Sequence, residues 1–395
     1  MTEVVPLFFQ KTLYPASAGE VAASVAKASA EGVNLIPFGN GSKVNVYKGN
    51  AACPSVGISL QKMNRIIEIN PVNLTVTVEA GITLALLQAE LGKKNVSLPV
   101  VVMSADKRTL GGLIAENFGN YEKYSHKNIG DYIIGLEFVT PTGELIRSGG
   151  KTVKNVAGYD FTRFLNGSLG TLGIITSVTF KLKPRPQERK TVLFAVPGLF
   201  EACALEEEIR QAIMTVTACH AFRINDTFNP GFFPNAKIAV AVSVQGSGSA
   251  VREHTAKLAA IASNRGYATA VLDSSDYWQV YDNRLQNLGT QHVITGRVNK
   301  RVLNGFIRLI ASQEQSFSAV FFDLGSSDYT LHCLDSEVEK TTRTDLAAFF
   351  AENGSPALSG KKPPHPIYVL LKGHLDKKNC LFAGNLAFTP TEKRL

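Results

Sequence analysis

Apolar residues in the first 183 positions form short segments that alternate between helical and strand-like spacing. The first helix is predicted at Val21–Ala30, because Ser17 and Glu20 have the spacing of a capping box and Gly32 can end a helix. Further helices are predicted at Thr83–Leu91, stopped by Gly92, and at Asp160–Leu165. Strands are predicted at Val33–Phe38, Ile66–Asn70, Leu74–Glu79, Ile133–Thr140, Glu144–Ser148 and Ile174–Leu182.

The pattern changes at Lys183–Pro186, where two prolines resist both a helix and a central strand. Beyond it the order β-α-β-β-α-β predicts an antiparallel sheet with helices on one face, as in ferredoxin-like domains. The elements predicted here are Thr191–Val196, Leu199–Met214, Thr215–Arg223, Ala236–Val244, Ala250–Arg265, Ala268–Leu272, Tyr277–Gln286, Arg301–Gln313, Ala319–Leu324 and Tyr329–Leu334. We therefore predict an α+β chain with domains at 1–186 and 187–366 and a C-terminal segment at 367–395.

Composition limits the class of protein. With 395 residues, 45% of them hydrophobic and only 19% charged, the chain has material for a large core and is not a disordered protein. Lys and Arg exceed Asp and Glu by 41 − 33 = +8 without a basic run, so we expect no nucleic-acid partner. No stretch reaches 18 apolar residues, so we expect no transmembrane segment. The start of the chain lacks the pattern of a secretory signal, which predicts a cytoplasmic location.

The five cysteines, at 53, 203, 219, 333 and 380, form no C-x-x-C pair. This spacing excludes a disulfide framework and the common iron–sulfur and structural zinc motifs. We therefore expect no metal site. The histidines are scattered: His332 lies in an alternating, strand-like run and His365 and His374 lie in or beside a loop, so each is interpreted as a packing or surface residue.

Three glycine-dense segments carry the candidate chemistry. They are Pro37–Ser42, directly after a strand, Thr109–Asn117, with a Gly-Gly pair at a predicted helix start, and Gly167–Ile175, which leads into a buried strand. Glycines expose backbone N–H groups that can surround a phosphate. Each segment alone is most simply a tight turn, and neither the Walker A nor the G-x-G-x-x-G spacing is present. Three of them in one domain favour a dinucleotide site, and without a nicotinamide fingerprint a flavin is the better candidate.

In this order the three segments resemble the FAD-binding domain of the vanillyl-alcohol oxidase / p-cresol methylhydroxylase superfamily. Within it, Gly150–Asp160, Gly167–Gly173 and Leu182–Pro186 are similar to the FAD-binding accessory subunit of bacterial glycolate dehydrogenase (glycolate oxidase). The likeness covers residues 10–186 and returns in Leu371–Asn385. It implies a two-subdomain FAD-binding domain of the p-cresol methylhydroxylase type, followed by a ferredoxin-like cap domain and a segment that returns to the FAD domain.

The resemblance also assigns roles to single residues. Pro37, Gly39, Asn40, Gly41 and Ser42 form the loop that would hold the pyrophosphate through backbone N–H groups. The second wall, along the pyrophosphate and ribityl chain, would be Thr109, Leu110, Gly111, Gly112 and Asn117, and Ile174 and Ile175 would touch the adenine half. Family members with a covalent flavin use a His or Cys near these loops. Here Asn40 follows Gly39 and Cys53 lies outside the loop, so we expect non-covalent FAD.

Two functions follow from the resemblance. In the first, the chain is the FAD-binding subunit of a glycolate or D-lactate dehydrogenase complex, relaying electrons or supporting a sibling FAD subunit together with an iron–sulfur subunit, and reaching a membrane only through such partners. In the second, it oxidises a small 2-hydroxy acid itself, passing a hydride to flavin N5. The histidine-rich stretch of the family's catalytic subunit is absent, which favours the first. The interpretation of Trp278 as a cap-domain core residue or as a neighbour of the flavin stays open, and no catalytic base is assigned.

Overall fold

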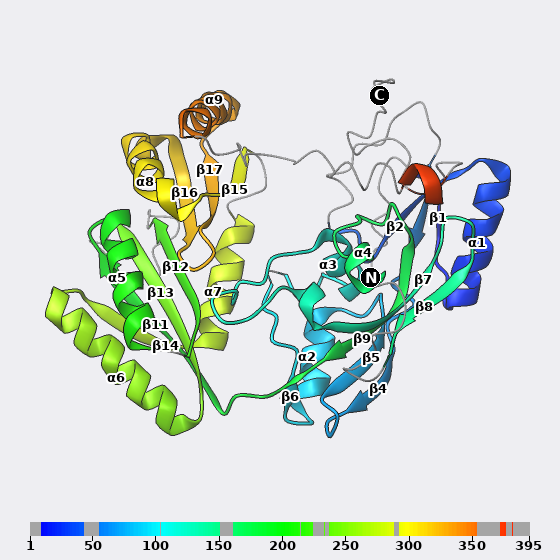
Figure 1. The fold of residues 1–395 in the computed structure, drawn as a ribbon, viewed down its shortest axis with the longest axis horizontal. Coiled ribbons are helices and arrows are strands. Elements are labelled where there is room, and N and C mark those ends of the chain that lie inside the picture. The colour runs from blue at the N-terminus through cyan, green and yellow to red at the C-terminus, as the bar shows by residue number, and fades with distance from the viewer. Residues whose placement is uncertain are drawn as a thin grey trace. The chain divides into compact units, whose positions relative to one another are not determined.

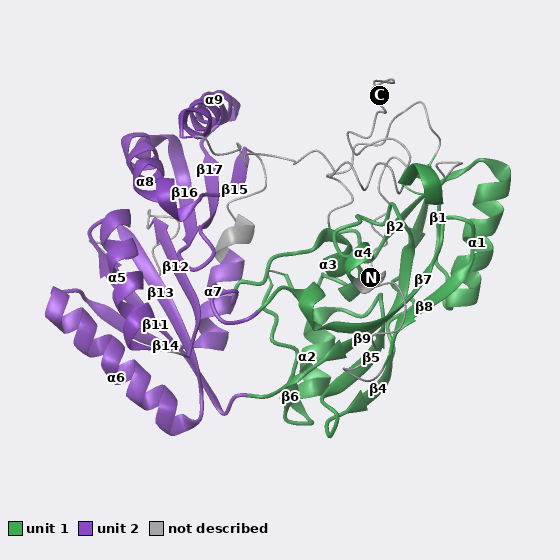
Figure 2. Ribbon diagram, in the orientation of Figure 1, with its two compact units in different colours: residues 1–121, 127–185, 363–395 green, residues 122–126, 186–362 purple. Residues whose placement is uncertain are grey.

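The computed structural model describes residues 9–42, 55–102, 104–150, 161–213, 215–223, 233, 237–287, 292–353, 372–376 and 381, without the side chains of 161, 162 and 284–287. The chain divides into two compact units. Unit 1 comprises residues 1–121, 127–185 and 363–395, and unit 2 comprises 122–126 and 186–362 (Figure 2). The run 151–160, on which part of the family resemblance rests, lies outside the described residues, as does most of 371–385.

The first layer of unit 1 is a parallel sheet with the strand order β1-β3-β2 among the described residues (Figure 1). Its strands are β1 (Phe9–Leu13), β2 (Asn34–Phe38) and β3 (Ser55–Ser59). The crossover between β1 and β2 is α1 (Ala18–Glu31). The predicted cap is present, because Ser17 Oγ accepts from the backbone N–H of Glu20 at 3.2 Å. The Glu20 carboxylate accepts from the N–H of Ala16 at 3.0 Å, one residue before the position that a capping box requires. Gly32 ends the helix with φ +67°.

The second layer of unit 1 is an antiparallel sheet in the order β4-β5-β9-β7-β8, again among the described residues. Its strands are β4 (Ile66–Asn70), β5 (Thr75–Glu79), β7 (Ile133–Val139), β8 (Leu145–Gly149) and β9 (Ile174–Lys181). The connecting elements are α2 (Leu84–Gly92), β6 (Val96–Ser97), α3 (Leu110–Glu116), α4 (Phe161–Leu165) and β10 (Lys183–Pro184). The side chains between these elements form one buried apolar core, which includes Leu35, Ile58, Val78, Leu110 and Phe180.

Unit 2 contains the predicted ferredoxin-like arrangement. Its first strands follow the order β14-β11-β13-β12, and β16, β17 and β15 extend the sheet beyond β12. The strands are β11 (Glu188–Val196), β12 (Val216–Arg223), β13 (Ile238–Gly246), β14 (Thr269–Asp273), β15 (Val293–Arg297), β16 (Phe317–Asp323) and β17 (Asp328–Cys333). The helices are α5 (Leu199–Ala212), α6 (Gly248–Arg265), α7 (Ser274–Asn287), α8 (Leu303–Ser312) and α9 (Ser336–Glu352).

The two faces of the unit 2 sheet are covered differently. Helices α5, α6, α8 and α9 lie on one face and α7 lies on the other (Figure 1). Under α7 the sheet carries His220 and Phe222, whose rings pack against Trp278 and Tyr281, with the His220 and Trp278 ring centroids 5.4 Å apart. Within unit 2 Trp278 therefore belongs to an aromatic cluster between α7 and the sheet.

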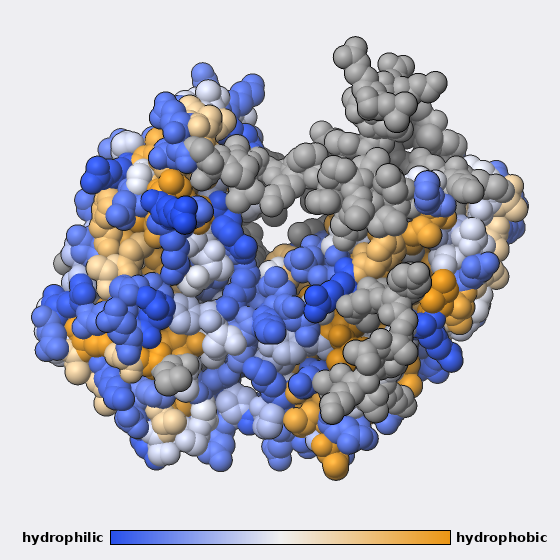
Figure 3. Space-filling view, viewed as in Figure 1, coloured by the Kyte–Doolittle hydropathy of each residue, from blue (hydrophilic) through white to orange (hydrophobic). Residues whose placement is uncertain are grey.

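The exposed apolar side chains form separate patches among hydrophilic ones in the view of Figure 3. Val271 on β14 and Val280 on α7 are among the exposed apolar residues of unit 2, with 50% and 43% of their surface exposed. Among the described residues, no helix combines the length and the apolar character that crossing a bilayer requires.

Candidate functional site

A cavity with an atom-free volume of about 820 Å³, part of it open to solvent, lies in unit 1. All three glycine-dense segments contribute to its wall. The lining residues are Pro37, Phe38, Gly39, Asn40, Gly41, Ser42, Leu60, Ala80, Arg108, Thr109, Gly111, Gly112, Leu113, Ala115, Glu116, Leu169, Gly170, Gly173, Ile174 and Ile175.

The first wall is the loop that leaves β2. The Gly39 carbonyl accepts a hydrogen bond from Ser59 Oγ at 2.9 Å, which holds the loop beside β3. A Cβ at Gly39 would lie only 2.1 Å from Thr109 Oγ1, so only glycine allows this approach. The N–H groups of Asn40, Gly41 and Ser42 donate to no described residue. The loop therefore presents backbone donors beside the cavity, as an anion site requires.

The second wall is the start of α3, and it differs from the expectation of free N–H groups. The N–H of Leu110 donates to the Ile82 carbonyl at 2.9 Å, and that of Gly111 donates to the Ala80 carbonyl at 2.8 Å. The N–H of Gly112 donates to Thr109 Oγ1 at 3.4 Å as part of the helix cap. These three N–H groups are already hydrogen-bonded within the protein. A ligand could therefore pack against the backbone of this wall, but it would not find free N–H donors there.

The third wall is the turn before β9. At Gly170, where φ is +76°, a Cβ would lie 2.6 Å from Pro37 Cγ, so the first and third walls touch at this point. A Cβ at Gly173 would lie 2.9 Å from the Phe138 ring. The glycines thus bring segments 130 residues apart in sequence close together, and Ile174 and Ile175 complete the wall as β9 begins.

Ten of the twelve predicted site residues line this cavity. Leu110 and Asn117 do not. Leu110 is fully buried in the core of unit 1. Asn117 is exposed and ends α3 in the left-handed conformation, with φ +47°, while its N–H donates to the Ile114 carbonyl. In the structure, Leu110 is therefore a core residue and Asn117 is the C-cap of α3.

The sequence analysis missed the two charged residues that line the cavity. Arg108 Nη1 lies 3.3 Å from Glu116 Oε2, and the two side chains are only 14% and 17% exposed. The Arg108 guanidinium also lies 4.1 Å from the centroid of the Phe118 ring. The position of Arg108, directly before the capping residue Thr109, is the one signal in the sequence that could have drawn attention to it.

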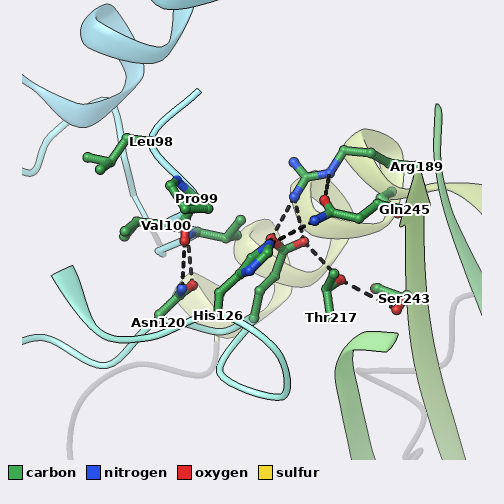
Figure 4. Close-up of polar contacts among 12 residues, drawn as sticks. Leu98, Pro99, Val100, Asn120, His126, Arg189, Thr217, Ser243 and Gln245 are labelled. Carbon is green, nitrogen blue, oxygen red and sulfur yellow. Dashed lines mark hydrogen bonds and ion pairs between the residues drawn. The ribbon is translucent and has the colours of Figure 1, made fainter. Parts of the chain in front are cut away.

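Unit 2 contains a second concentration of charge, which we call the polar network: Glu122, His126, Arg189, Thr217 and Gln245. Arg189 donates to both oxygens of Glu122, at 2.7 and 2.6 Å, and Thr217 Oγ1 donates to Glu122 at 3.3 Å. His126 Nε2 lies 2.8 Å from Gln245 Nε2. Figure 4 shows the labelled members converging on one point. Burial raises the pKa of the Glu122 carboxyl, an effect that Arg189 and Thr217 oppose.

Two other side chains of segment 122–126, those of Lys123 and Tyr124, also have partners inside unit 2. Lys123 forms an ion pair with Asp328 on β17, and the Tyr124 hydroxyl donates to Glu206 on α5 at 2.7 Å. The positive charge of Lys123 is therefore used in a structural contact within unit 2. His332 lies buried on β17 beside Phe321, and burial lowers the pKa of its imidazole, in agreement with a packing role.

Comparison with known proteins agrees with this site. Residues 9–149 match the model of a family described as FAD binding domain. Residues 9–149 therefore resemble an FAD-binding domain, in agreement with the predicted fold of the p-cresol methylhydroxylase type. FAD is its cofactor. The glycine-lined cavity, with exposed backbone donors on one wall, suits a ligand with a diphosphate at its centre.

Among curated relatives, the chain is 38% identical over 214 residues to glycolate oxidase subunit GlcD of Bacillus subtilis (strain 168), covering 53% of this chain and 42% of the relative. It is 33% identical over 185 residues to a D-2-hydroxyglutarate dehydrogenase of Xanthomonas citri pv. viticola, covering 47% and 39%. It is 32% identical over 123 residues to glycolate oxidase subunit GlcE of Escherichia coli (strain K12), covering 31% and 35%. The chain thus spans less than half the length of these relatives.

The fold itself extends over nearly the whole chain. A solved alkyldihydroxyacetonephosphate synthase superposes with a TM-score of 0.72 over 93% of this chain and 75% of that one, at 20% identity. This likeness confirms the predicted architecture, an α+β chain with the FAD-binding fold, and at this identity it concerns the fold alone.

Proposed function

We propose that this chain is the FAD-binding subunit of a multi-subunit 2-hydroxy-acid dehydrogenase of the glycolate or D-lactate type. In this proposal it relays electrons or supports a sibling catalytic subunit. The observation that carries it is the cavity in unit 1, whose walls are the three glycine-dense segments. The matches to glycolate oxidase subunits GlcD and GlcE support the substrate class and the membership in a complex.

We propose that the cavity holds FAD without a covalent bond. The backbone N–H groups of Asn40, Gly41 and Ser42 would bind the diphosphate, and Thr109, Gly111 and Gly112 would lie along the neighbouring part of the cofactor. Ile174 and Ile175 would contact the adenine half. The Asn40 side chain is an amide, which cannot attach to the flavin ring. Bound FAD would supply the acceptor for two electrons from a hydroxy acid.

The relay function is supported by the way the described titratable groups are used. The charged side chains that line the cavity are Arg108 and Glu116, and they pair with each other. In unit 2, Glu122 and Asp328 are each held by cations of the same unit. A small carboxylate substrate and its base are therefore assigned to a sibling FAD subunit, and onward electron transfer to an iron–sulfur subunit. We place the chain in the cytoplasm, reaching a membrane only through these partners.

The alternative is that the chain itself oxidises the hydroxy acid. The match to a D-2-hydroxyglutarate dehydrogenase favours it. Anaerobic titration of the purified, FAD-loaded chain with glycolate and with D-lactate separates the two functions. We expect the flavin absorbance to persist with the chain alone and to bleach once the sibling subunits are added. Bleaching by the lone chain within seconds would refute the relay function.

A further inference from the structure

We infer that Arg108 recognises the diphosphate of FAD, and that Glu116 is the counter-ion that holds Arg108 in place before the cofactor binds. The inference rests on the proposed location of FAD in the cavity of unit 1. It adds a side-chain cation to the backbone donors of the loop at residues 39–42, and it predicts opposite effects of changing the two members of one ion pair.

The first support is the position and state of Arg108. Among the described residues that line the cavity, Arg108 and Glu116 are the charged ones, so the wall carries one positive and one negative charge. The Arg108 Nε is buried and, within the described residues, has no hydrogen-bond partner. A guanidinium has five N–H donors, and a buried donor without an acceptor costs about 1–3 kcal/mol. The buried Nε is closed off from the cavity, so a ligand there would use the Nη donors of the guanidinium, of which Nη1 donates to Glu116.

The second support is that the dipole of helix α3 does not account for the positions of Arg108 and Glu116. Arg108 precedes the cap of α3, at the end of a helix where positive charge is unfavourable, and Glu116 is the last residue of α3, where negative charge is unfavourable. Each charge thus lies at the wrong end for the helix dipole. Their mutual attraction and the Phe118 ring keep the guanidinium beside the cavity.

The third support is the chemistry of the ligand. The diphosphate is the anionic part of FAD, and arginine binds phosphate oxygens in a planar, often bidentate geometry. When these anions approach, Glu116 becomes a like charge within reach of the same cation. The carboxylate should therefore weaken binding of FAD, whereas the guanidinium should strengthen it.

The test measures flavin affinity of the full chain after removal of FAD, by titration followed through flavin fluorescence at low and high salt. Riboflavin, which lacks phosphate, is the second ligand. Arg108→Gln should weaken binding of FAD about 10- to 100-fold and leave riboflavin within about 2-fold. Glu116→Gln should tighten binding of FAD about 3-fold or more. The salt dependence of FAD binding should fall in Arg108→Gln.

Arg147→Gln is the matched control, because Arg147 pairs with Glu137 in unit 1 but is 80% exposed and does not line the cavity. Equal losses for FAD and riboflavin in Arg108→Gln would show a structural role and overturn the inference, as would unchanged FAD binding. Gly39→Val distinguishes failure of the inference from failure of the proposed location. If that variant binds FAD normally, the cofactor lies elsewhere.

Discussion

The cavity of unit 1 and the polar network of unit 2 are built on opposite principles. The cavity is lined mostly by glycine and apolar residues, and its loop at 39–42 has backbone donors that bind no described residue. In the polar network, Glu122 is 1% exposed and its oxygens are held by Arg189 and Thr217. One region leaves hydrogen-bonding capacity unused beside open space, and the other uses it within the protein. This difference supports the proposal that the cavity binds the ligand and that the polar network stabilises unit 2.

The largest effect should come from removing the cation of the polar network. Arg189→Ala leaves the Glu122 carboxylate buried without its main partner, which should reduce the free energy of unfolding of unit 2 by about 3 kcal/mol. Chemical denaturation measures this loss. Arg147→Ala, which breaks an exposed ion pair in unit 1, should cost less than about 1 kcal/mol. Similar losses in the two variants would contradict the assigned structural role.

The next effect concerns the cavity. Gly39→Ala places a methyl group where Thr109 Oγ1 lies 2.1 Å away, so the first and second walls must separate. Overpacking of this kind costs about 1–3 kcal/mol, which corresponds to about 10- to 100-fold weaker FAD binding if the walls move apart. Gly19→Ala, in helix α1 with open space around it, is the control and should retain FAD. Retention of FAD by Gly39→Ala would contradict the assignment of ligand binding to the cavity of unit 1.

A smaller effect is expected when helix caps are removed, and it distinguishes a loss of protein stability from a loss of FAD affinity. Thr109 caps α3 beside the cavity, and Ser247 caps α6 in unit 2 by accepting from Ala250 N at 3.3 Å. Thr109→Ala and Ser247→Ala should each cost about 1 kcal/mol of stability. FAD affinity should fall in Thr109→Ala alone. Equal FAD affinities in the two variants would remove Thr109 from the proposed site.

The smallest effect is a pH dependence of unit 2. Burial acts to raise the pKa of the Asp328 carboxyl, but hydrogen bonds from Arg297 and Lys123 outweigh it and hold the pKa below its usual value of 3.8. Because the folded pKa is lowered, this contribution to stability is present above the unfolded pKa and is lost as the pH falls through the folded pKa. In melting experiments between pH 5 and about 2.5, Asp328→Asn should lose less stability than the parent chain. An unchanged pH profile would exclude Asp328 as the titrating group.

Much of the architecture could be predicted from local signals. The capping residues Ser17 and Thr83 and the glycine at 32 act within a few positions of the helices that they begin or end, so sequence spacing is sufficient to find them. The glycine-dense segments were visible for the same reason. Helix α9 was missed because its buried residues, Thr342, Leu346 and Phe350, are sparse among charged ones. Strand β15, with the sequence Val-Ile-Thr-Gly-Arg, is a short edge strand that shows no alternation of apolar and polar residues.

The rest depended on contacts between distant residues. Glu122 meets Arg189 across 67 positions and Lys123 meets Asp328 across 205, and no local pattern encodes such pairs. The Arg108–Glu116 pair spans only eight positions. It was missed because neither charge lies where the helix dipole would favour it.

The segment at 122–126 has a practical consequence for dividing or recombining this protein. A fragment that starts at Pro186 would lack Glu122, so Arg189 would lose its carboxylate partner and Thr217 one of its two acceptors. A chimera joined to a related chain at the single junction near residue 186 would face the same mismatch. Exchange of unit 2 between relatives therefore requires that two separate stretches, 122–126 and 186–362, be exchanged together.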